Sequence, residues 1–113
     1  MGRGVASIED FAALDIRIGV IRTVRLHPTA KKPAYQLEID FGPLGVKWSS
    51  AQLTALYGED DLLHRQVVAV VNFPPRRIGG FTSEVLVLGA LKEDGAVILL
   101  TPERSAQPGD RIA

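Results

Sequence analysis

The segment that most constrains the fold spans residues 67–88, VVAVVNFPPRRIGGFTSEVLVL. It begins and ends with apolar runs, residues 67–71 and 85–88, whose short length and β-branched content are typical of buried strands. Pro74 and Pro75 cannot donate hydrogen bonds to a sheet, so the first strand must end near Phe73. The sequence therefore predicts two strands, joined by a connector of prolines, arginines and glycines that lies between the two apolar runs.

The connector carries two arginines and two glycines. Gly79 and Gly80 permit positive φ angles, which allows the chain to turn back toward the second strand. Arg76 and Arg77 precede this turn, so we expect both side chains to be presented to solvent. Paired arginines in such a place suit phosphate or carboxylate recognition. Two ordinary charges on a solvated loop are the alternative, and these residues alone leave both interpretations open.

The N-terminal segment, residues 1–13, is expected to contain a short helix from residue 8 to residue 13. Ser7 is a good N-cap, and Asp10 occupies the third helical position, where its carboxylate can complete a capping box. Apolar residues recur at helical spacing from Ile8 through Phe11. We expect this helix to cover one end of the core.

Three strands are predicted next, over residues 15–26, 35–41 and 46–49. In the first strand the alternation places Arg22 on the same face as the apolar residues. Either a bulge near Gly19 or strong coiling of the strand must therefore exchange the environments of its two faces. The second strand alternates apolar and polar residues, which places one face, Tyr35 included, in the core. In the third strand Lys47 and Trp48 lie on opposite faces.

A second helix is predicted from Ser49 to residue 57. Ser49 can cap it, Gln52 stands at the capping-box position, and Gly58 can end it. Asp60 and Asp61 are expected in the first turn of another short helix, where the helix dipole favours acids. A last strand is expected over residues 96–100.

Together these elements predict an all-β fold with short helices. Three strands, a helix and three further strands are typical of a five-stranded Greek-key barrel of the OB type with extra short strands. The length of 113 residues suits one domain, residues 1–113, in which the helix plugs one end of the barrel. Prolines break up the C-terminal tail, residues 101–113.

Composition excludes several functional classes. The chain has no cysteine, which excludes disulfides, thiolate chemistry and cysteine zinc sites and fits a reducing compartment. His27 and His64 belong to neither a catalytic nor a metal-ligand spacing. We therefore expect no catalytic residues, no metal and no cofactor. No apolar run approaches the ~20 residues of a membrane span, and the N-terminus lacks an apolar signal core, so a cytoplasmic protein without membrane insertion is expected.

Charge is distributed unevenly along a chain of zero formal net charge. No acid interrupts residues 16–37, which contain a run of cations, whereas Glu59 begins an acidic cluster. A neutral molecule with one basic side is therefore expected. The predicted anion-binding cations are Arg17, Lys31, Lys32, Lys47, Arg76 and Arg77. Because aromatic platforms for stacking are scarce, such cations would recognise the shape of a nucleic-acid backbone.

Apolar residues beside the arginines suggest a different ligand. Phe73, Ile78 and Phe81 flank the connector, and an apolar patch rimmed by cations can accept an unfolded polypeptide. Alternatively, at least one of them closes a dimer seam. A third alternative is a dimerisation module without a ligand, against which the basic cluster argues.

Five segments of the chain, in order, resemble the tRNA-binding-domain family. They are LDIRIG, HPTAKKPAYQLEIDFG, KWSSAQLT, VVNFPPRRIGGFTSEVLVLGA and VILLTPE, and the resemblance covers roughly residues 11–108. The most specific part is NFPPRR followed by Ser-Glu, because Asn72, Pro75, Arg76, Ser83 and Glu84 match the family pattern.

The resemblance implies an OB-fold homodimer that binds tRNA structure. It adds Asn72 and Ser83 to the anion-binding residues. The segments KKPAY and SSAQ are most similar to the branch of small export-related chaperones, which implies unfolded or presecretory polypeptides as partners. A polypeptide-binding chaperone is thus the first functional prediction, and structure-specific tRNA binding is the alternative.

Overall fold

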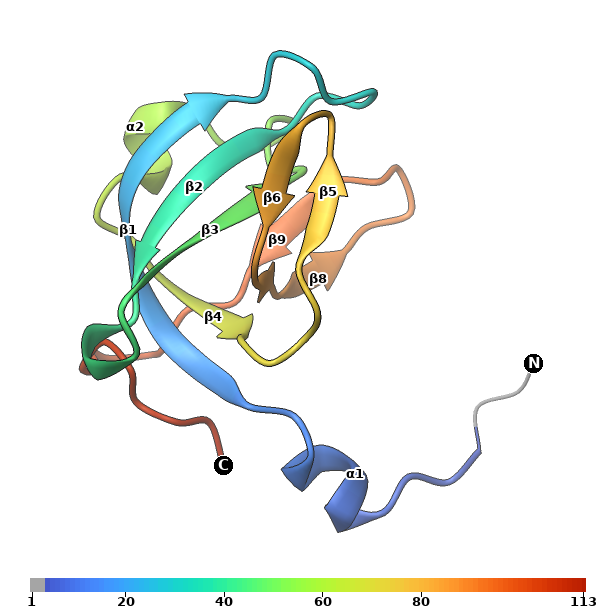
Figure 1. The fold of residues 1–113 in the computed structure, drawn as a ribbon, viewed down its shortest axis with the longest axis vertical. Helices are drawn as coiled ribbons and strands as arrows, with labels where there is room; N and C mark the ends of the chain where they lie inside the picture. The colour runs from blue at the N-terminus through green and yellow to red at the C-terminus, as the bar shows by residue number, and fades with distance from the viewer. Residues whose placement is uncertain (1–3) are drawn as a thin grey trace.

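The computed structural model describes residues 4–113; the first three residues of the N-terminal segment lie outside the described part (Figure 1). Most of the regular secondary structure is β-strand, and five strands make one curved sheet in the order β3-β2-β1-β4-β7. The elements are α1 (Ile8–Ala12), β1 (Ile16–Leu26), β2 (Tyr35–Asp40), η1 (Gly42–Leu44), β3 (Val46–Ala51), α2 (Glu59–Leu62), β4 (Gln66–Val70), β5 (Arg76–Ile78), β6 (Phe81–Ser83), β7 (Leu86–Val87), β8 (Gly89–Leu91) and β9 (Val97–Leu99).

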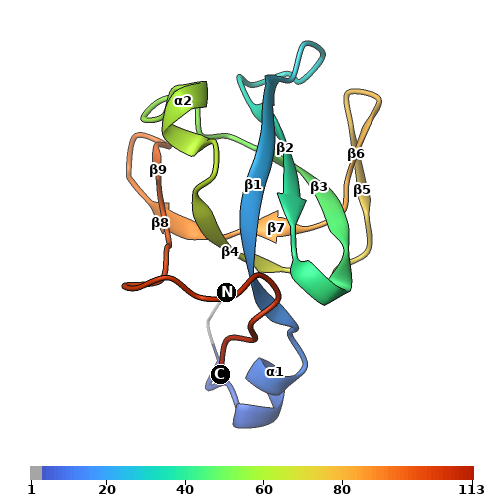
Figure 2. The ribbon, with the colours of Figure 1, turned by 90° about the vertical axis from the view of Figure 1, so that its left-hand side faces the viewer.

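The sheet curls into a nearly closed barrel, which confirms the predicted fold class (Figure 2). All its strand pairs are antiparallel, and β1 pairs with both β2 and β4. The open edge of β3 is covered by the chain around β6, where the Glu84 amide donates to the Trp48 carbonyl at 2.8 Å. Two hairpins, β5–β6 and β8–β9, stand beside the barrel.

The first strand changes phase through a bulge, although not at the predicted position. The β1–β2 register shifts between Ile21 and Thr23, which places the extra residue at Arg22 rather than near Gly19. Gly19 instead allows close packing, because a Cβ there would lie 2.5 Å from the Ile39 Cγ2 atom. The exposed Arg22 side chain on the apolar phase is thus explained by the bulge.

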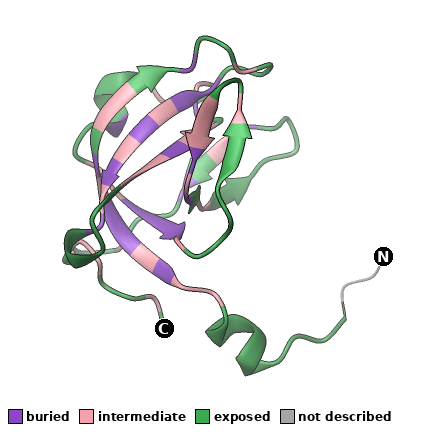
Figure 3. Ribbon diagram, viewed as in Figure 1, coloured by how far each residue is buried: buried purple, intermediate pink, exposed green. Residues whose placement is uncertain are grey.

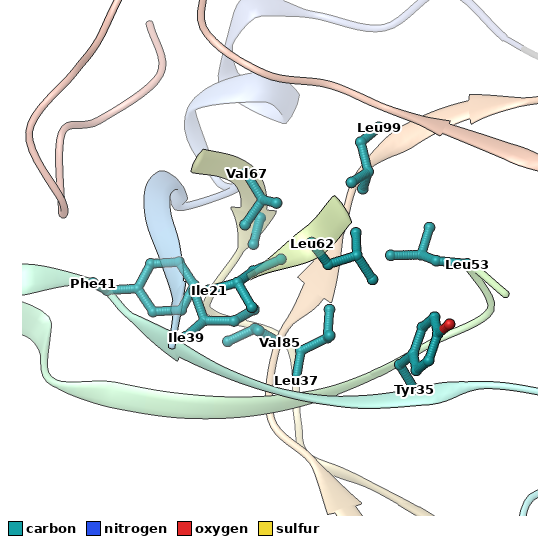
Figure 4. Close-up of a cluster of buried hydrophobic side chains, with 11 residues drawn as sticks. Ile21, Tyr35, Leu37, Ile39, Phe41, Leu53, Leu62, Val67, Val85 and Leu99 are labelled. Atoms are coloured by element: carbon teal, nitrogen blue, oxygen red, sulfur yellow. The ribbon is translucent and has the colours of Figure 1, made fainter. Parts of the chain in front are cut away.

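The interior of the barrel is filled by inward-facing aliphatic and aromatic side chains (Figures 3 and 4). Leu37, Ile39 and Phe41 alternate along and just beyond β2 and are fully buried. Leu62 of α2 enters the same cluster and closes one end of the barrel. Each such side chain contributes roughly 1.5–3 kcal/mol on burial. Tyr35 is buried, as predicted, and its hydroxyl donates to the Tyr57 carbonyl at 2.8 Å.

The predicted helix over residues 49–57 is wrong. β3 continues to Ala51, with Ser49 paired to Leu37 and Ser50 paired to Gln36 of β2. The Ser49 hydroxyl is buried and donates to the Val85 carbonyl at 3.1 Å, so it does not cap a helix. Pairing with β2 satisfies this backbone, and tertiary context overrides the local capping signal. The helix between the third and fourth strands is α2, whose acidic first turn matches the prediction for Asp60 and Asp61.

Helix α1 forms with the predicted capping box, but its predicted place is wrong. The Ser7 hydroxyl accepts from the Asp10 amide at 3.2 Å, and the Asp10 carboxylate accepts from the Ser7 amide at 2.8 Å. The helix extends away from the barrel instead of covering the core (Figure 1). It buries none of its residues, and Ile8 is 72% exposed.

The connector is more ordered than a loop, because residues 76–83 form the hairpin β5–β6. The strand predicted over residues 85–88 is shorter than expected, because β7 contains only Leu86–Val87. The proline-containing tail is irregular, but backbone hydrogen bonds attach it to β1. The Ile18 amide donates to the Asp110 backbone carbonyl, and the Ile112 amide donates to the Ile16 carbonyl. Among the described residues no helix is long and apolar enough to cross a membrane.

Candidate anion- and peptide-binding groove

A groove of about 630 Å³ lies between the loop that follows β1 and the hairpin β5–β6. Its walls are residues 29–34 on one side and residues 76–79 on the other, and the end of β3 together with β7 and β9 forms its floor. The loop after β1 and the tip of the hairpin lie near each other at one end of the barrel in Figures 1 and 2.

The two walls are joined at the tip of the hairpin. Gly79 and Gly80 have φ angles of +55° and +80°, as a two-residue turn between twisted strands requires. The Thr29 hydroxyl donates to the Gly79 carbonyl. A Cβ at position 79 would lie 2.5 Å from the Thr29 carbonyl oxygen, so only glycine permits this approach. The turn residues therefore position the arginines of β5 opposite the loop.

Aromatic packing supports the hairpin from beneath. The Phe81 ring meets the His27 ring edge-on at 5.3 Å and the Trp48 ring at 5.9 Å. His27 is buried, and its Nδ1 atom lies 3.2 Å from the Ser50 hydroxyl. The Arg25 guanidinium covers the Trp48 ring at 4.8 Å. These contacts fix the hairpin on the outer face of the sheet.

The groove is lined by four cations and by no acid. They are Lys31, Lys32, Arg76 and Arg77. Within residues 4–113 the ion pairs are Arg17–Asp15 and Arg104–Glu103, so none of the four groove cations is neutralised by a described carboxylate. Arg77 donates one bond to the Thr82 hydroxyl at 2.7 Å and keeps its other donors. The groove can therefore bind phosphate or carboxylate oxygens with charge-assisted hydrogen bonds.

The floor of the groove is apolar and continues into a second cavity. Leu53, Leu86 and Val97 line the floor. A neighbouring cavity of about 200 Å³ is lined by Phe73 together with Ile78 and Leu86, which also line the groove. Two of the predicted peptide-binding residues, Phe73 and Ile78, thus border adjoining cavities. Phe81 lines neither of them, because it packs against the rings beneath the hairpin.

The remaining predicted anion-binding residues do not line the groove. Arg17 lies 2.5 Å from the Asp15 carboxylate and donates to the Gly109 carbonyl at 3.0 Å, which attaches the tail to β1. Lys47 lies on β3 opposite Ile39, outside the lining.

The polar residues of the family pattern hold the backbone. The Asn72 side chain accepts from the Asp15 amide at 2.8 Å and donates to the Ala13 carbonyl at 2.9 Å, which anchors the chain between α1 and β1. Ser83 is buried, and its hydroxyl accepts from the Ser50 amide at 2.9 Å.

Several groove residues gave no functional signal in the sequence. Leu86 and Val97 lie in runs that predict core strands, and Leu53 was expected on a helix. Thr29 lies two residues before Lys31, and the predicted anion-binding residues Lys31 and Lys32 are the local sequence signal for this wall. Within residues 4–113 no group of three or more His, Cys, Asp or Glu side chains is arranged to hold a metal ion.

Comparison with known proteins gives one matching family. Residues 16–111 match the family model described as a putative tRNA binding domain. The fold is similar to that of the chaperone CsaA from Bacillus anthracis str. Ames, with 51% identity, a TM-score of 0.93 and coverage of 97% of this chain and 100% of that one. The CsaA chaperone protein from Picrophilus torridus is 50% identical, with a TM-score of 0.90 and coverage of 96% and 100%.

The curated relatives are longer proteins. Methionine–tRNA ligase from Thermococcus onnurineus is 40% identical over 105 residues, which are 92% of this chain and 14% of that enzyme. The chain therefore corresponds to a small part of such a ligase.

Proposed function

The chain belongs to the tRNA-binding-domain family, in its CsaA-type branch. We propose that it is a chaperone-like protein that binds unfolded or presecretory polypeptides in protein export. The observation that carries the proposal is the groove, in which an apolar floor adjoins unpaired cations. Burying apolar surface gives about 25 cal/mol per Å², so a few client side chains would bind weakly and with little sequence preference. Such binding suits a protein that must release what it holds.

Structure-specific binding of tRNA is the second candidate function. The family model and the ligase relatives favour it, as do the four cations of the groove. These side chains would contact phosphates, whereas Arg17, Lys47, Asn72 and Ser83 would contribute from outside the groove or by holding its backbone. A formal net charge of zero weakens long-range attraction to a polyanion, which places this function second.

The proposal includes the state in which the protein acts. We expect a cytoplasmic homodimer whose activity is binding alone, without a catalytic step or a cofactor. Two solved structures that are 51% and 50% identical to this chain are described as chaperones, which supports binding as the activity. The apolar side chains left exposed on α1 support a second copy as partner.

Ile78→Thr tests the polypeptide function, because Ile78 lines both cavities. The variant should suppress the aggregation of a denatured client several-fold less well than the parent, measured by light scattering. Leu91→Thr is the matched control, since Leu91 is 76% exposed on β8 and lies outside the groove. Phe81 is less suitable for this purpose because it supports the hairpin.

The dependence on salt separates the two functions. Client binding through the apolar floor should survive high salt and show a negative heat-capacity change. The affinity for tRNA should fall steeply as salt is raised, because counterion release becomes less favourable. If client binding disappears with salt and Ile78→Thr behaves like its control, tRNA binding becomes the better account.

A further inference from the structure

The strand β5 has a free edge inside the groove. It pairs with β6 on one side only, and these two strands form a separate two-stranded sheet. Arg76, Arg77 and Ile78 of β5 line the groove, whereas the residues of β6 do not. A strand edge that faces a cavity presents hydrogen-bonding backbone groups to whatever enters it.

The register of the hairpin identifies the outward-facing residue. Ile78 and Phe81 flank the two-glycine turn, so they exchange both backbone bonds, and Arg76 and Ser83 form the next bonded pair. Arg77 and Thr82 are the close, non-bonded pair between them, in keeping with their side-chain hydrogen bond of 2.7 Å. The N–H and C=O of Arg77 therefore point away from β6, toward the free edge.

We propose that the groove binds an extended polypeptide segment as an added strand on β5, paired through the backbone N–H and C=O of Arg77. This inference rests on the proposed polypeptide function and specifies its mode. Strand addition takes its affinity from main-chain hydrogen bonds, which every client sequence offers. Alternate side chains of the added strand point to opposite faces, so one set meets the apolar floor and the other faces solvent.

The charge of the groove selects among such segments. Lys31, Lys32, Arg76 and Arg77 surround the added strand, and no acid lines the groove. Apolar residues next to Asp or Glu, or next to a C-terminal carboxylate, gain charge-assisted bonds there. Segments rich in Lys or Arg meet like charge and are disfavoured. The client class is therefore an extended apolar segment with neighbouring carboxylates.

A scan with N-methylated peptides tests the proposal on the unmodified protein. The probe is a ten-residue peptide of alternating Val and Thr that ends in two Glu residues, and its affinity is measured by calorimetry. Methylation of one backbone nitrogen removes one donor, so affinity should fall at least tenfold at the one peptide position whose N–H pairs with the Arg77 carbonyl and little at the neighbouring positions. At low salt, replacing the two Glu residues with Lys should also weaken binding at least tenfold, and high salt should reduce this difference.

The protein side is tested with Arg77→Pro against Arg77→Ala. Both lose the guanidinium, but only proline loses the outward N–H, which an edge strand can lack without breaking the hairpin. Arg77→Pro should bind the probe at least fivefold more weakly than Arg77→Ala.

The possible results separate the binding mode from the function. If the probe binds but no single position is sensitive to methylation, strand addition is wrong and polypeptide binding stands. If the unmethylated probe does not bind while tRNA does, the polypeptide function itself is contradicted, and the strand-addition mode is excluded with it.

Discussion

At the scale of single residues, Gly79 holds the site together. Its φ of +55° turns the hairpin, and its missing side chain lets the tip approach Thr29 of the opposite wall. Gly80 shares the positive φ, but a Cβ there would meet nothing within 4 Å. Both glycines are therefore required by the backbone of the turn, whereas only Gly79 is also required by the close approach of the groove walls.

Gly79→Ala and Gly80→Ala should differ for this reason. A left-handed conformation costs an alanine roughly 1–2 kcal/mol, which both variants should lose in free energy of unfolding, measured with urea. Gly79→Ala also places a Cβ against the Thr29 backbone, so it should be the less stable variant. It should weaken tRNA and client binding by roughly tenfold, and Gly80→Ala should leave both nearly unchanged. Equal binding by the two variants would show that the contact with Thr29 does not shape the groove.

At the scale of elements, the hairpin β5–β6 carries the arginines, and the body of the barrel positions the hairpin. Phe81 anchors it on His27 and Trp48, and the Ser83 hydroxyl connects it to β3. Both Arg76 and Arg77 remain exposed on this fixed base. Because the backbone beneath them is already ordered, binding through these arginines costs only the rotamer freedom of the side chains.

Replacing Arg76 and Arg77 together with Ala should weaken tRNA binding and reduce its salt dependence. Two lost phosphate contacts should make the slope of log affinity against log salt shallower by about 1.4–1.8. The matched control is Arg22→Ala with Arg111→Ala, which removes the same charge from exposed positions outside the groove. If both double variants shift the slope equally, Arg76 and Arg77 act only through net charge.

At the scale of the whole molecule, helix α1 requires an explanation that the barrel does not supply. A five-residue helix is not stable by its own hydrogen bonds, and α1 buries none of its residues. Val5, Ile8 and Phe11 leave apolar surface exposed on and beside it. Burial of this surface against a second copy would stabilise the helix and fits the proposed homodimer.

Sedimentation at micromolar concentration should therefore give twice the chain mass of 12.2 kDa. Ile8→Asp combined with Phe11→Asp should produce a folded monomer, because neither residue belongs to the buried core of its own chain. The far-ultraviolet spectrum serves as the control for folding. A parent protein that sediments as a monomer would remove the dimer from the proposal.

Features that depend on local chemistry can be predicted from the amino-acid sequence alone. Alternation from Tyr35 onward predicted β2 and its buried face, the Ser7–Asp10 pair predicted α1, and the glycines predicted the turn after Arg77. Each of these signals is contained in a short stretch of adjacent residues, and the fold agrees with it.

Contacts across the whole fold determine which local signals prevail and which residues come together. Ser49 has the local chemistry of a helix cap, but pairing with β2 makes it a buried strand residue. Asn72 resembles a ligand-binding residue, yet its amide holds the backbone at Ala13 and Asp15, far away in sequence. Lys31 and Arg76 line the same groove although they lie on different segments of the chain, and no periodicity in the sequence indicates this. Contacts between distant residues depend on the whole fold, which is why the site emerged only with it.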